Sequence, residues 1–139
     1  MPENASSAKS TMQSTILLLI SEPLVRQVMR EELERAGYTV LATGDLGTAV
    51  ERLSETPPDL LMISPYVETI PGHQAAKYLQ SRCQGMRLLM VAGLLEDDRI
   101  QTRAELEQMA IFPQPFTGSQ LLEKVRAVLS GPRISGTDS

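Results

Sequence analysis

Five short apolar runs, separated by stretches long enough to form helices, limit what this chain can fold into more than any other feature. Runs of this kind, bounded by turn residues, are typical of strands that are covered on both faces. Strands that alternate with helices join through right-handed crossovers into one parallel sheet. The sequence therefore predicts an α/β domain with helices on both faces of a parallel sheet, and strands at residues 16–20, 38–41, 60–63, 88–92 and 110–112.

The segments between these runs carry helical patterns with recognisable ends. In the first helix Ser21 is a candidate N-cap, Pro23 lies in the first turn, and Gly37 suits a left-handed residue after the last turn. In the last helix Thr117 and Gln120 have the spacing of a capping box. These signals and the amphipathic patterns predict helices at about residues 23–36, 46–56, 71–82, 99–107 and 117–129.

Length and composition indicate a single globular domain. Of the 139 residues, 42% are hydrophobic and 22% are charged, which is an ordinary balance for a folded domain. The start of the chain is polar, and its end is rich in glycine, serine and proline. We therefore expect a disordered leader at residues 1–14, a folded domain at residues 15–130 and a flexible tail at residues 131–139.

Charge and hydropathy disfavour several classes of partner. The net charge of -4, without a run of lysine or arginine, leaves no electrostatic footprint for nucleic acid. The apolar run at residues 16–20 is far too short to span a bilayer, and the start of the chain lacks the apolar segment of a secretory signal. The single cysteine, Cys83, cannot form an internal disulfide. We expect a cytoplasmic protein that contacts neither nucleic acid nor membrane.

Several short phrases, in order and at matching spacing, resemble the receiver domain of bacterial response regulators. Together they cover most of residues 15–130. The resemblance implies a flavodoxin-like sheet of strand order 2-1-3-4-5 and a role in two-component signalling, or phosphorelay, in a bacterium. It also implies chemistry at the carboxyl ends of the strands, near the switch between strands one and three. The phrases lie at residues 16–19, 22–26, 34–40, 58–61 and 114–116, with Gly72 at the position of the family's loop glycine.

The chain departs from the family at the positions that handle the phosphoryl group. Ser64 follows the third strand, where the family has the aspartate that accepts phosphate. Ala92 replaces the hydroxyl residue after strand four, and Gln114 replaces the lysine after strand five. Phosphoryl transfer depends on positioned charge, and a serine alcohol without a base is a poor nucleophile. A catalytic pair of Ser64 with His73, the only histidine, is disfavoured because nothing in the sequence brings the two together.

The positions that bind magnesium in the family have also lost their charge. Ile20 and Ser21 stand where the family has an acidic pair, and Glu22 is the only acid beside them. Because Mg²⁺ requires hard anionic oxygens in an octahedral array, we expect no metal and no cofactor here. Small neutral side chains at these positions would then only fill the space of a site that has lost its chemistry. The former phosphorylation pocket is expected at Ile20, Ser21, Glu22, Ser64, Ala92 and Gln114.

Two functions remain in competition. The first is a phosphorylation-independent pseudo-receiver, meaning a receiver-like signalling module without enzymatic activity that acts by contact with another protein. The second keeps a switch in the former pocket, driven either by a small ligand or by modification of Ser64. The pseudo-receiver is favoured because the charged residues that handle the phosphoryl group in the family are replaced. A rise in melting temperature on addition of a ligand would favour the switch.

A candidate interaction face follows from the resemblance, because receivers signal through helix four, strand five and helix five. Acidic residues in the fourth predicted helix and basic residues in the fifth could align a protein partner or a second copy of the chain. Two ordinary solvated helix faces explain the same charges equally well. The strand position of the family's aromatic switch is occupied by isoleucine. The candidate residues are Glu105, Ile111, Lys124 and Arg126.

Overall fold

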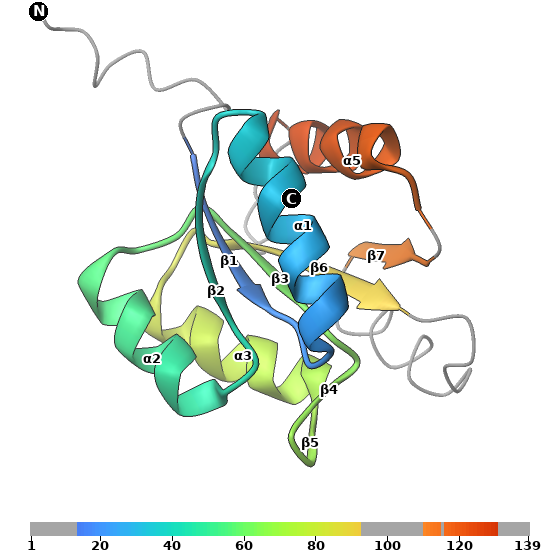
Figure 1. Ribbon diagram of the computed structural model, residues 1–139. Helices are drawn as coiled ribbons and strands as arrows, with labels where there is room; N and C mark the ends of the chain where they lie inside the picture. The colour runs from blue at the N-terminus through green and yellow to red at the C-terminus, as the bar shows by residue number, and fades with distance from the viewer. Residues whose placement is uncertain (1–13, 93–109, 115, 131–139) are drawn as a thin grey trace, which may run out of the picture.

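The computed structural model describes residues 14–92, 110–114 and 116–130. Within them five strands form one parallel sheet in the order β2-β1-β3-β6-β7 (Figure 1). This confirms the predicted fold class and strand order. Pro113 is the last residue of β7, which lies at an edge of the sheet. A proline is tolerated there because it has no backbone N–H to donate to a neighbouring strand. The strands are β1 (Thr15–Leu19), β2 (Thr39–Thr43), β3 (Leu60–Ile63), β6 (Arg87–Ala92) and β7 (Ala110–Pro113).

Four described helices cover the two faces of this sheet. Helices α1 (Pro23–Arg35) and α5 (Gly118–Ser130) lie on one face, and α2 (Leu46–Glu55) and α3 (Gly72–Arg82) lie on the other (Figure 1). The helix expected at residues 99–107 lies outside the described residues, as do most of the expected leader and the whole expected tail.

The central strand β1 is buried on both sides, which explains its continuous apolar sequence. Successive side chains of a strand point to opposite faces. Ile16 and Leu18 accordingly pack into the core beneath α1 and α5, whereas Leu17 and Leu19 pack into the core beneath α2 and α3. All four are fully buried, and each contributes about 1.5–3 kcal/mol relative to an exposed side chain.

The helix ends agree with the sequence in part. Thr117 and Gln120 form the predicted capping box, with reciprocal bonds of 2.9 and 3.0 Å between side chains and backbone N–H groups. Gly37 has a φ of 104°, a conformation that a side chain would disfavour. The prediction that Ser21 caps α1 is wrong. Glu22 occupies the N-cap position and makes no capping bond with its side chain, and the Ser21 hydroxyl donates to the carbonyl of Tyr66.

A small hairpin after β3 was not predicted. Strands β4 (Tyr66–Val67) and β5 (Ile70–Pro71) pair antiparallel, so that helix α3 begins at Gly72, one residue later than expected. The turn contains Glu68 with a φ of 60°, which is unusual for a residue other than glycine. Two-residue strands carry too little pattern to be recognised in a sequence.

Replacement of Gly72 by alanine should destabilise the fold. A Cβ atom there would overlap the carbonyl oxygen of Ser64 and approach that of Pro65 to 3.0 Å. Because these are backbone atoms, relief requires main-chain movement, and the expected cost is at least about 2 kcal/mol in urea unfolding. The matched control is Gly47→Ala in α2, whose Cβ would meet only the Asp45 carboxylate at 3.4 Å. That variant should be neutral or more stable by up to about 1 kcal/mol. Equal stability of the two variants would contradict this assignment.

Candidate functional site

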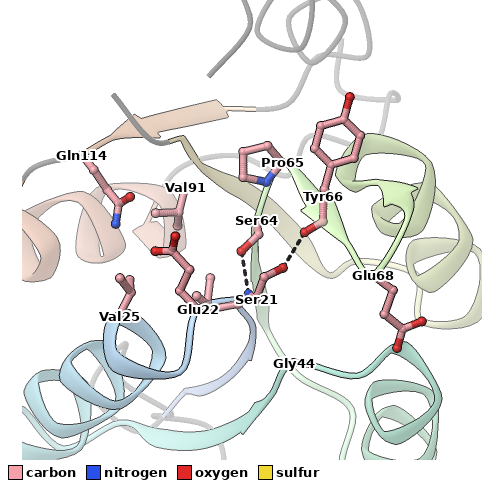
Figure 2. A pocket seen from close by; sticks show the side chains of 11 residues that line it. Ser21, Glu22, Val25, Gly44, Ser64, Pro65, Tyr66, Glu68, Val91 and Gln114 are labelled. Atoms are coloured by element: carbon pink, nitrogen blue, oxygen red, sulfur yellow. Dashed lines mark hydrogen bonds between the residues drawn. The ribbon is translucent and has the colours of Figure 1, made fainter. Parts of the chain in front are cut away.

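A cavity of about 480 Å³ opens where the β1–α1, β2–α2 and β3–β4 connections meet (Figure 2). Strands β2 and β3 lie on opposite sides of β1, so the chain changes direction at this point. Open parallel sheets place their ligand sites at such a switch, outside the carboxyl ends of the strands. The cavity is lined by Ile20, Ser21, Glu22, Val25, Gly44, Ser64, Pro65, Tyr66, Glu68, Val91 and Gln114.

Ser64 lies at the floor of this cavity, directly after β3. Its backbone N–H donates to the carbonyl of Leu19 at 3.1 Å, which continues the pairing of β3 with β1. Its side-chain oxygen accepts the backbone N–H of Ser21 at 2.9 Å (Figure 2). Among the described residues, no second partner lies within hydrogen-bond distance of this hydroxyl, and Ser64 is only 8% exposed. Within the described part of the chain, the hydrogen of this hydroxyl thus has no acceptor.

Ser21 ties the first connection to the β4–β5 hairpin. Its hydroxyl donates to the carbonyl oxygen of Tyr66 at 2.6 Å. At the turn of the hairpin, the Glu68 carboxylate accepts the N–H of Leu46 at 3.4 Å, at the first turn of α2. Anions are favoured at a helix N-terminus, which helps to hold Glu68 in its left-handed conformation. The two bonds fix the hairpin to two separate connections around the cavity.

Arg26 lies close to the cavity but does not line it. Its guanidinium donates to the carbonyl of Ile20 at 2.6 Å. A Cβ atom on Gly44 would overlap the same guanidinium, so a larger residue there would require the Arg26 side chain to move. Among the described residues that line the cavity there is no lysine, arginine or histidine, whereas two glutamates are present.

Most of the predicted pocket residues are brought together here. Ile20, Ser21, Glu22, Ser64 and Gln114 all line the cavity. Ala92 ends β6 beside Pro113, and its side chain lies outside the described part of the chain; Val91 lines the cavity from the same strand. His73 lies in the first turn of α3 and is not among the described lining residues, so the disfavoured pair with Ser64 gains no support.

Several lining residues were missed from the sequence. Tyr66 and Glu68 reach the cavity through the hairpin, which had no recognisable pattern. Gly44 follows β2, and its position could have been inferred from the carboxyl-end rule alone. Val25 lies in the first turn of α1, and the sequence pattern predicts no place for it in the pocket.

The predicted interaction face is only partly described. Glu105 lies outside the described residues. Ile111 is half-buried and packs against the core beneath α2 and α3. On α5, Lys124 is half-buried and Arg126 is exposed. The opposition of charges between neighbouring helices therefore stays a prediction.

An apolar groove of about 290 Å³ runs beside α1 and shares the walls formed by Val25 and Gln114 with the cavity. Leu24 is 78% exposed and Val28 is 55% exposed, one helical turn apart. These two large apolar side chains face solvent without cover from the described residues. The groove is completed by Met29 and Phe116.

Asp45 caps helix α2 at the rim of the site. Its carboxylate accepts both the backbone N–H and the hydroxyl of Thr48 at 2.8 Å. The Thr48 hydroxyl, then the Thr48 N–H, and then a hydrogen bond with Glu68 lower the pKa of Asp45. A carboxyl whose pKa is lowered by folding stabilises the folded state above its ordinary pKa, and this contribution is lost as the pH falls.

The Asp45→Asn variant should distinguish the effect of the capping hydrogen bond from the effect of the negative charge on Asp45. Asparagine can accept the same bond from Thr48, so the helix start should persist at neutral pH. The wild type should lose more stability than the variant between about pH 5 and pH 2.5, because only the aspartate becomes protonated. Urea unfolding across this range measures the difference. Parallel pH profiles for the two proteins would contradict the lowered pKa.

A sequence profile of the response regulator receiver domain family matches residues 16–126, so the chain belongs to this family. It is a receiver domain of two-component signalling. Among the described residues, no helix is both long and apolar enough to cross a membrane.

Two curated relatives illustrate the similarity. The alkaline phosphatase synthesis transcriptional regulatory protein PhoP of Bacillus subtilis is 23% identical over 128 residues, covering 92% of this chain and 53% of PhoP. The response regulator MprA of Mycobacterium ulcerans is 25% identical over 130 residues, covering 92% of this chain and 55% of MprA. The chain thus spans about half the length of the curated relatives that it matches.

Solved structures show the same fold. A putative response regulator from Chloroflexus aurantiacus superposes with a TM-score of 0.74 at 20% identity, covering 86% of this chain and 99% of that one. The chemotaxis protein CheY4 of Vibrio cholerae superposes with a TM-score of 0.74 at 18% identity, covering 84% of this chain and 98% of that one. At this level of identity, the likeness concerns the fold alone.

The Mg²⁺ ion that the family pattern implies does not fit the residues present. Magnesium demands near-octahedral oxygen ligands that converge on one point. Within the described ranges, no group of three or more aspartate, glutamate, histidine or cysteine side chains could hold a metal ion. The end of β1 offers Ile20, Ser21 and the single carboxylate of Glu22, and the end of β3 offers only the neutral hydroxyl of Ser64.

Proposed function

We propose that this chain is a pseudo-receiver, a receiver-like module that signals by protein contact without phosphorylation and without enzymatic activity. One observation carries the proposal: the side chain after β3 is a neutral serine whose oxygen is already bonded to the Ser21 N–H. An acyl phosphate requires a carboxylate at this point, and no described hydrogen bond joins the Ser64 hydroxyl to a basic side chain.

The surroundings of Ser64 support the same proposal. Stabilisation of a phosphoryl group in transfer comes from cations placed around its oxygens. Gln114 occupies the position of the family's lysine, and Arg26 is engaged with the Ile20 carbonyl. Glu22 and Glu68 add negative charge, which would repel a phosphoryl group rather than attract it.

Exposed apolar surface beside α1 supports a protein-contact role. Contiguous exposed apolar patches are uncommon on monomeric proteins and often mark interaction sites. Leu24 and Val28 form such a surface together with the groove beside them. A partner protein would then bind the module whether or not it is phosphorylated, and would respond to its presence or its conformation.

A switch in the former pocket is the second candidate function. The volume of about 480 Å³ is large enough for a small molecule, which favours a ligand. Modification of Ser64 by a kinase is less favoured, since the residue is 8% exposed and its oxygen is already bonded.

Beryllofluoride with magnesium, a mimic of the acyl phosphate, should leave the protein unchanged. Position 64 carries a serine and not the carboxylate that would bind beryllium, and the described residues do not form a magnesium site. Amide spectra recorded by NMR should therefore show no saturable shifts at Ser64, Ser21 or Gln114. A receiver that keeps the acceptor aspartate serves as the positive control. Saturable shifts around Ser64 at millimolar reagent would show that the proposal is wrong.

Charge reversal on α5 tests the predicted interaction face. If opposite charges align two copies of the chain, the double variant Lys124→Glu and Arg126→Glu should weaken association measured by light scattering, because like charges would then oppose each other. The expected loss is about threefold to tenfold, and it should shrink at high salt. Reversal of Arg52, an exposed residue on α2, is the control. Association that is unchanged in the double variant would remove this face from the proposal.

A further inference from the structure

The β4–β5 hairpin forms one wall of the cavity, and its position depends on contacts outside itself. Pro65, Tyr66 and Glu68 line the cavity from this connection. Each strand has two residues, and among the described residues the two strands pair only with each other. An isolated two-stranded hairpin is at best marginally stable in water. The hairpin therefore stays in place because other parts of the chain hold it.

Two exposed hydrogen bonds and a buried apolar side chain hold the hairpin against the domain. The Ser21 hydroxyl donates to the Tyr66 carbonyl at 2.6 Å (Figure 2). The Leu46 N–H donates to the Glu68 carboxylate at 3.4 Å, which is long for a hydrogen bond. Val67 is fully buried in the core beneath α2 and α3. Burial of Val67 favours the observed position, and the two exposed bonds add smaller contributions to it.

The turn of the hairpin opposes these contacts with backbone strain. The pairing of β4 with β5 leaves Glu68 and Thr69 as a two-residue turn. Glu68 has a φ of 60° and is the one non-glycine residue with a positive φ in the described ranges. A positive φ at only the first turn residue is typical of a type II′ turn, in which glycine is preferred at this position. A glutamate there keeps strain in the observed turn, and such strain often lies in segments that change conformation.

The carboxylate of Glu68 compensates for this strain only weakly. Its bond with the Leu46 N–H is exposed as well as long. The Asp45 carboxylate also lies close enough to Glu68 for a hydrogen bond. Two carboxylates at such a distance repel each other when both are ionised. The turn therefore gains little from the contacts that hold it.

Ser21 connects the hairpin to the start of α1. Its N–H donates to the Ser64 side-chain oxygen at 2.9 Å, and its hydroxyl donates to the Tyr66 carbonyl. Helix α1 begins two residues later, at Pro23, and Val25 in its first turn lines both the cavity and the groove. Movement of the hairpin would take one of these two bonds from Ser21, so the connection before α1 would gain freedom.

We propose that the β4–β5 hairpin is a strap with two positions. In the closed position, which the structure shows, Ser21 and the burial of Val67 hold it against the cavity; in the open position the turn at Glu68 relaxes. The inference rests on the proposed function, because a module that signals without phosphorylation requires another change in the surface that it presents. Opening would widen the cavity beside Tyr66 and alter the groove beside α1 through the connection at Ser21.

Hydrogen exchange of the hairpin amides in the full chain, followed by NMR, tests the strap. Ser21→Ala removes the bond to Tyr66 and keeps the backbone N–H of residue 21, so the Val67 and Ile70 amides should exchange about fivefold faster. Ser81→Ala is the matched control, because the Ser81 hydroxyl also donates to a carbonyl at 2.6 Å but lies on α3. This control should leave the exchange of the hairpin unchanged.

A pair of substitutions at the turn measures the strain. Glu68→Ala removes the carboxylate and keeps a Cβ atom at the positive φ, whereas Glu68→Gly removes both. Neither side chain can accept the Leu46 N–H, so the difference in hairpin exchange between the two variants reports the backbone strain. The hairpin should exchange at least about threefold more slowly in Glu68→Gly than in Glu68→Ala. Equal exchange in the two variants would show that the turn stores no strain, and would overturn the strap.

Coupling of the strap to α1 is tested from the opposite face of the sheet. Val67→Ala weakens the burial that keeps the strap closed, and Val67 packs in the core beneath α2 and α3. This variant should shift the amide resonances of Leu24 and Val25, because opening frees the connection before α1. Val50→Ala makes the same truncation in the same core, on α2, and should leave these resonances unchanged. Urea unfolding establishes that each variant is folded, and the exchange measurements carry the test if Val67→Ala is not.

Failure of this inference differs from failure of the proposed function. Unchanged hairpin exchange in Ser21→Ala would show that the hydroxyl holds nothing closed. Equal acceleration at the buried Leu61 amide of β3 would show global unfolding in place of local opening. Either result would overturn the strap while beryllofluoride remained without effect. Binding of beryllofluoride at Ser64 would overturn the proposed function even where the hairpin exchanged as expected.

Discussion

The pairing of β1 with β3 is the interaction on which the rest of the structure depends. The two strands lie at the centre of the sheet in parallel register, from Ile16 opposite Leu60 to Leu19 opposite Ile63. Every residue of both strands is buried, so each contributes to one of the two cores. Because the pairing continues through the Ser64 N–H to the Leu19 carbonyl, the same register places Ser64 beside the β1–α1 connection. The location of the candidate site is thus a consequence of packing at the centre of the sheet.

At this location, neutral hydrogen bonds join the connections that follow β1 and β3. The Ser21 N–H bonds the Ser64 hydroxyl, and the Ser21 hydroxyl bonds the Tyr66 carbonyl. A cluster of carboxylates at the same point would have to bear mutual repulsion and desolvation unless a metal ion neutralised it. The serines remove that requirement, and Glu22 and Glu68 are the carboxylates among the described lining residues. This distribution of charge is the physical basis of the proposed function.

Much of the fold could be predicted because burial on both faces leaves a strong signal. Strand β1 appears as an uninterrupted apolar run, and the Thr117–Gln120 capping box marks a helix start by spacing alone. Ser21 was misassigned because a serine before a helix usually bonds that helix, whereas here its hydroxyl is taken by Tyr66, forty-five positions along the chain. The β4–β5 hairpin was missed because two-residue strands have no measurable period. The strand order required the family resemblance, since periodicity cannot tell which strands become neighbours.

By itself, the sequence determined the class of fold and the absence of an acidic residue after the third strand, because both depend on residue type and local order. Only the tertiary structure decided which side chains share the cavity. Glu68 enters it from a turn in which this residue has a left-handed conformation, and Gly44 lines it where the connection after β2 passes close to the guanidinium of Arg26. Contacts between distant connections depend on how the strands stack side by side, and no local pattern in the chain encodes that geometry.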